Sequence, residues 1–81
     1  MMSMDLLKAS KDNMRFMVEE MERKLNMLNL GALKAADLHE ELYYELKDLY
    51  DVIKRQNHFS PSEYQAIAEE LGRLRRKVEK E

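Results

Sequence analysis

The chain has 81 residues, of which 44% are apolar and 37% charged, with two glycines, one proline and no cysteine. Without cysteine, a disulfide, a thiolate zinc site and an iron–sulfur cluster are all excluded, and no apolar run approaches the ~20 residues that span a bilayer. We therefore expect one small, all-α domain that is cytoplasmic and has no membrane partner.

Charge is distributed unevenly along the chain, although the formal net charge is only −2. Residues 1–72 carry 9 basic and 14 acidic side chains, a balance of −5, and residues 73–81 carry 5 basic and 2 acidic ones, a balance of +3. Nucleic-acid-binding domains usually have a broader basic footprint. The acidic body therefore argues against binding of nucleic acid as the main role.

The first predicted element is a helix over residues 11–30, because apolar residues recur every three or four positions from Met14 to Leu28. Ser10 or Asp12 is expected to cap its start, and Gly31 to cap its end. The preceding leader, residues 1–10, is either an extra turn or a disordered arm. Residues 11–81 are predicted to form a single domain.

The second predicted helix covers residues 38–55. Asp37 and Glu40 have the spacing of a capping box. Its apolar stripe, spaced as on one face of a helix, consists of Leu38, Leu42, Leu46, Leu49, Tyr50 and Ile53. The segment ALKAAD before it is expected to be a short connection, which could itself form a helical turn.

The third predicted helix covers residues 61–79 and has the clearest start. Ser60 is the expected N-cap, Pro61 fits the first turn, and Glu63 completes a capping box. Phe59 and Tyr64 occupy the two positions of a hydrophobic staple. The expected buried stripe consists of Tyr64, Ile67, Ala68, Leu71, Leu74 and Val78. Gly72 lies inside this pattern and marks either a close contact or an early helix end.

Three amphipathic helices with short connections predict a small three-helix bundle, since each apolar stripe needs the others to cover it. All seven methionines lie in the first 27 residues, and methionine suits adaptable binding surfaces as well as irregular cores. Phe16, Met17 and Met27 lie beside the central stripe of the first helix. They are the candidate contact residues for a protein partner or a second copy of the chain.

The basic end supplies a second candidate surface, with Arg73, Arg75, Arg76 and Lys77 as candidate anion contacts. Ala68, Gly72 and Val78 have the spacing of a helix-turn-helix motif. The residues after Gly72, however, lack a polar cap and leave too little chain for a recognition helix. Weak nucleic-acid binding is kept as the alternative to a solvated helix end.

Chemistry-bearing motifs are absent from the sequence. His39 is followed by Tyr43 where a metalloprotease helix has its second histidine, and neither histidine follows a glutamate by three positions as in di-iron bundles. The carboxylates are spread along polar faces, without the close pairing that separates two pKa values. We therefore expect no catalytic, cofactor or metal site, and a non-enzymatic protein that acts by protein–protein contact.

Three segments together resemble a known family: KLNMLNLG (24–31), ELKDLYDVIKRQN (45–57) and FSPSEYQAIAEELGRLRRK (59–77). They are similar to the YfkK-like family of short uncharacterised bacterial proteins, over residues 14–77, with the leader outside. The resemblance implies a small cytoplasmic helical protein of unknown function. It carries over no catalytic or binding residue.

Overall fold

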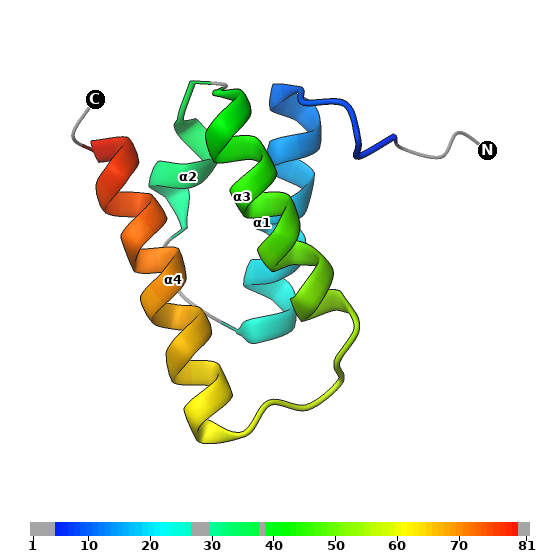
Figure 1. Cartoon of the computed structure of the whole chain (residues 1–81), viewed down its shortest axis with the longest axis vertical. Coiled ribbons are helices and arrows are strands. Elements are labelled where there is room, and N and C mark those ends of the chain that lie inside the picture. Colours follow the sequence, from blue (N-terminus) through cyan, green and yellow to red (C-terminus); the bar gives the residue numbers. More distant parts are fainter. Residues whose placement is uncertain (1–4, 27–29, 38, 80–81) are drawn as a thin grey trace.

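The computed structural model describes residues 5–26, 30–37 and 39–79 of the chain. These residues form four helices and no strand. Their bounds are α1 (Lys11–Leu25), α2 (Gly31–Ala35), α3 (Glu40–Lys54) and α4 (Pro61–Glu79). The three long helices correspond to the three predicted ones, so the prediction of a small all-α bundle is confirmed. Figure 1 shows the short α2 as an addition between the first and second of them.

Helix α1 begins as predicted and ends earlier than predicted. Ser10 is the N-cap, and its hydroxyl accepts a hydrogen bond from the Asn13 backbone N–H. The predicted end at Leu30 with a Gly31 cap is wrong, because Asn26 takes the left-handed conformation with φ 54° and ends the helix after Leu25. Asparagine tolerates this conformation better than most residues. Gly31 instead begins α2.

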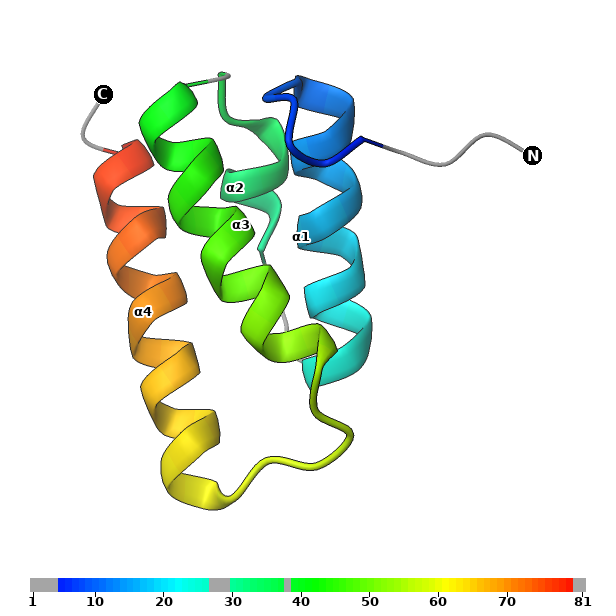
Figure 2. The same cartoon turned by 45° about the vertical axis from the view of Figure 1, so that its right-hand side comes forward.

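The connection between α1 and α3 is a structural element rather than a simple link. Helix α2 buries Leu33 completely and packs against both α1 and α4, behind α3 in the view of Figure 2. The predicted Asp37 capping box of α3 is not formed. His39 is the N-cap, and no side chain caps this helix. Leu38, the predicted first residue of this helix, lies outside the described residues.

Helix α4 confirms the predicted capping box. The Glu63 carboxylate accepts from the Ser60 backbone N–H at 2.9 Å, and the Ser60 hydroxyl accepts from the Glu63 N–H at 3.1 Å. Gly72 does not interrupt the helix, which continues to Glu79. Tyr64 is more exposed than predicted, as are all residues from 60 to 66. The reason is that the first turns of α4 extend past the end of α3 (Figure 1).

The core lies mainly between α1 and α3, with α2 and the second half of α4 covering it. Met14, Met17, Val18 and Met21 of α1 are fully buried. The described part of the leader is attached to the same core. The buried Tyr43 hydroxyl donates to the Leu6 carbonyl at 2.5 Å, so residues 5–10 lie against the N-terminal ends of α1 and α3 (Figure 2).

Candidate interaction surface

The predicted partner residues of the first helix lie mostly in the core. Met17 is fully buried, so its side chain presents no surface to a partner. Phe16 is half-buried and its ring meets the Tyr50 ring edge-on, with 6.3 Å between the centroids. Met27 lies outside the described residues. Of the two described members of this set, only Phe16 is partly accessible.

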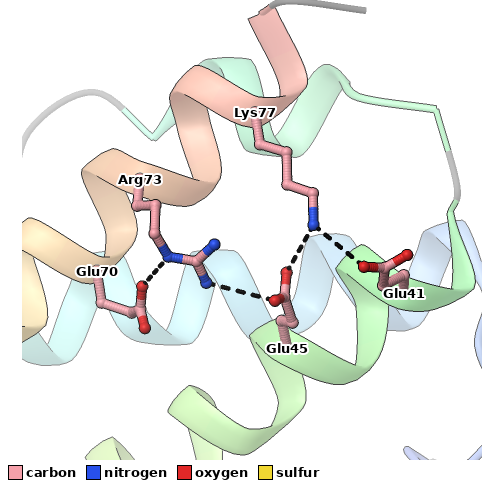
Figure 3. Close-up of polar contacts among 5 residues, drawn as sticks. All are labelled: Glu41, Glu45, Glu70, Arg73 and Lys77. Atoms are coloured by element: carbon pink, nitrogen blue, oxygen red, sulfur yellow. Dashed lines mark hydrogen bonds and ion pairs between the residues drawn. The ribbon is translucent and has the colours of Figure 1, made fainter.

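Two of the four predicted anion contacts pair with carboxylates of α3 (Figure 3). Arg73 reaches from Glu70 on its own helix to Glu45, with 3.4 Å between Arg73 Nη2 and Glu45 Oε1. Lys77 Nζ lies 3.4 Å from carboxylate oxygens of both Glu41 and Glu45. These five side chains form a charge network between α3 and α4.

This network changes the proton affinity of its two cations. The hydrogen bond to Glu70 is the main reason that the pKa of Arg73 is raised. The hydrogen bond to Glu41 has the same effect on the pKa of Lys77. Both cations are exposed enough for water and salt to screen these pairs. The network therefore joins α4 to α3, and it is expected to add little stability.

The other two predicted anion contacts are not part of the network. Arg76 is exposed. Arg75 is half-buried, and its Nε is buried without a hydrogen-bond partner among the described residues. The structure therefore does not gather the four cations into one site.

A groove with an apolar floor lies between α3 and α4. Its volume is about 350 Å³, and it is open to solvent. Leu49 and Val52 of α3 and Leu74 of α4 form the floor. Val52 is 37% exposed. We call this hollow the α3–α4 groove.

The rim of the α3–α4 groove is acidic. Glu45, Asp48 and Glu70 contribute three carboxylates, and Arg73 contributes one guanidinium. Arg73 already pairs with Glu45 and Glu70. Asp48 is exposed and forms no salt bridge with a described residue, although it interacts electrostatically with Lys47. The rim as a whole therefore keeps an excess of negative charge.

A second hollow, of about 500 Å³, lies beside the C-terminal ends of α1 and α3. Its cations have internal partners. Lys24 Nζ donates to the Lys54 carbonyl, Lys54 Nζ lies 5.4 Å from the centre of the Tyr50 ring, and Arg23 pairs with Glu20. Cations at helix C-terminal ends complement the helix dipole. A structural role therefore accounts for this hollow.

Residues 5–26, 30–37 and 39–79 contain neither a metal-binding cluster nor a membrane-spanning helix. No group of three or more His, Asp or Glu side chains there could hold a metal ion. No helix within the same residues is long and apolar enough to cross a membrane.

Sequence reasoning missed Glu41 and Glu45 as partners of the basic end, and it missed the α3–α4 groove. The sequence did contain one indication of the pairing between Glu41, Glu45 and the basic end. Glu41 and Glu45 are four apart, as are Arg73 and Lys77, and residues four apart lie on one face of a helix. Opposite charges at equal spacing on two helices that run past each other favour such cross-pairing.

The sequence profile of the family described as "Protein of unknown function (DUF1128)" matches residues 6–76. Three curated relatives align with this chain over 74 residues, which are 91% of this chain and the whole length of each relative. UPF0435 proteins of Geobacillus sp. strain WCH70, Geobacillus thermodenitrificans and Bacillus cereus strain B4264 are 55%, 50% and 49% identical. No solved structure matches. The chain belongs to the DUF1128 family.

This membership confirms the predicted resemblance to a family of unknown function, while the YfkK-like label stays a prediction. One boundary is corrected. The match begins at residue 6, so it includes the part of the leader that was expected to fall outside. That part contains Leu6, whose carbonyl accepts the Tyr43 hydroxyl.

Proposed function

We propose that this member of the DUF1128 family is a non-enzymatic cytoplasmic protein that acts by contact with another protein or with a second copy of itself. Residues 11–81 would form its single domain. The α3–α4 groove is the observation that supports the proposal, since Val52 and Leu49 are left partly exposed there. Contact surfaces commonly combine such an apolar centre with a polar rim.

Two measurements test this function directly. Light scattering of the purified protein gives its mass in solution, and a pull-down from the native cell extract recovers a partner. We expect a dimer or one reproducibly enriched protein. A strict monomer that recovers no partner would contradict the proposal.

Binding of nucleic acid through the end of α4 is the second candidate function. Exposed Arg76 and the unpartnered Nε of Arg75 favour it, while the internal pairing of Arg73 and Lys77 opposes it. Affinity for duplex DNA and for RNA should be measured across a salt series, because phosphate contacts weaken as salt rises. Binding that Arg75→Ala and Arg76→Ala leave unchanged, or no binding at low salt, would exclude this function.

A further inference from the structure

The α3–α4 groove has the shape of a site for a helix rather than for a small molecule. Small-molecule pockets enclose most of their ligand's surface, whereas this groove is open to solvent. Its α3 wall runs from Glu45 to Val52, which is two helical turns or about 10 Å. A partner helix that presents apolar residues three and four positions apart matches a floor of this length.

The groove exists because α3 and α4 meet through side chains. Close backbone contacts join α1 to α3, α1 to α2 and α2 to α4, while the described parts of α3 and α4 make few with each other. Their charged side chains bridge the distance at one end, from Arg73 and Lys77 to Glu45 (Figure 3). Beyond that bridge Leu49 and Val52 lack a covering layer from α4.

Charge decides which helix fits. Three rim carboxylates face one guanidinium, and that guanidinium is already shared between Glu45 and Glu70. Asp48 forms no salt bridge with another described side chain, and its electrostatic neighbour is Lys47 on the same helix. An acidic rim attracts lysine or arginine and repels phosphate or acidic segments.

We infer that the α3–α4 groove binds an amphipathic helix of a partner protein, with an apolar stripe on Leu49 and Val52 and with flanking basic residues on Asp48 and the rim. The inference rests on the proposed function, since it names the class of partner. It also places the contact on the side of α3 that faces α4, beside the core.

The test uses full-length, ¹⁵N-labelled protein and three synthetic peptides of about 18 residues, long enough to form a helix. The first is an amphipathic Leu/Lys helix. The second has the same composition in scrambled order, and the third has Glu in place of Lys. We expect the first peptide alone to shift the amide signals of Leu49, Val52 and Leu74 to saturation.

Two charge-reversal variants separate a specific site from general attraction. Asp48→Lys is expected to weaken the affinity of the Leu/Lys peptide by about tenfold, because it reverses the unpaired rim charge. Asp48→Asn should give a smaller loss. Glu19→Lys, with the same charge change on the exposed face of α1, should leave the affinity nearly unchanged. Circular dichroism confirms that each variant is folded.

Besides failure of the Leu/Lys peptide to bind, three results would overturn the inference. One is that the scrambled peptide or the Glu peptide binds as tightly as the amphipathic Leu/Lys peptide. Another is that Glu19→Lys weakens the affinity of the Leu/Lys peptide as much as Asp48→Lys does. The third is a set of concentration-dependent shifts at the same amides without peptide, which would identify a second copy as the occupant. Peptide failure together with a partner recovered from extract would reject the inference and leave the proposed function standing.

Discussion

The two long faces of α3 meet their neighbours in different ways. One face buries Leu46, Tyr50 and Ile53 in the core shared with α1. The other presents Glu41, Glu45 and exposed Val52 toward α4, and it joins that helix through ion pairs. A single helix thus has one face that holds the fold together and one that remains available for contact.

The packed face should dominate stability, and one pair of truncations tests this. Leu46 is fully buried and Val52 is partly exposed on the opposite face. We expect Leu46→Ala to lower the free energy of unfolding by about 2–5 kcal/mol, because it leaves a cavity. Val52→Ala should cost far less. Urea denaturation measures both, and equal losses would mean that the two faces do not differ.

High pH should weaken the packed face as its tyrosines ionise. Burial raises the pKa of both Tyr43 and Tyr50, so the unfolded chain loses these protons first. The stability is therefore complete below about pH 10 and falls above it, by at most about 1.4 kcal/mol per pH unit for each proton.

The free energy of unfolding in urea should be measured at several pH values from 7 to 11. These values lie on both sides of the ordinary tyrosine pKa near 10. Lys47, whose pKa is raised mainly by its hydrogen bond to Asp51, contributes in the same direction. The variants Tyr43→Phe and Tyr50→Phe should each flatten the slope. A slope that neither variant changes would contradict the assignment to these two groups.

The exposed start of α4 should depend on its cap, because residues 60–66 have little packing. Ser60→Ala removes the acceptor for the Glu63 N–H, and we expect a loss of about 1 kcal/mol. Ser60→Asp keeps an acceptor and should retain most of the stability. If the denaturation midpoint of Ser60→Ala equals that of the wild type, the helix start does not rely on this cap.

The smallest effect is expected at the charge network. Arg73→Gln removes the pairs with Glu45 and Glu70, but water solvates the carboxylates that are left. The shift of the denaturation midpoint should be smaller than that of Ser60→Ala, and smaller still in high salt. A larger shift would show that ion pairs rather than the core hold α4 in place.

These elements differ in how far the sequence predicts them. The period of Met14, Val18 and Met21 identifies α1, and the local pattern of Ser60 and Glu63 identifies the start of α4, because neighbouring residues determine both. The early end of α1 was not predicted, because it depends on the left-handed conformation of Asn26. Gly31 was the other residue that suits this conformation, and it was chosen as the C-cap.

Features that depend on how the helices pack could not be predicted from the sequence pattern. Tyr43 is not part of the predicted stripe of the second helix, yet it is fully buried and its hydroxyl finds a partner in the Leu6 carbonyl, 37 residues away in the chain. Val52 lies on the polar side of α3, so its place on the groove floor depends on where α4 packs. Met17 was predicted as a partner contact because it lies beside the central stripe of the first helix, whereas the packed structure buries it completely.

Site-specific photocrosslinking in living cells tests the central claim most directly. A photoreactive amino acid would replace Val52 in the α3–α4 groove or Glu19 on the exposed face of α1. We predict a covalent adduct with one partner protein at Val52 and little or none at Glu19. The absence of an adduct at Val52, or equal adducts at both positions, would contradict the claim that this face of α3 is the contact surface.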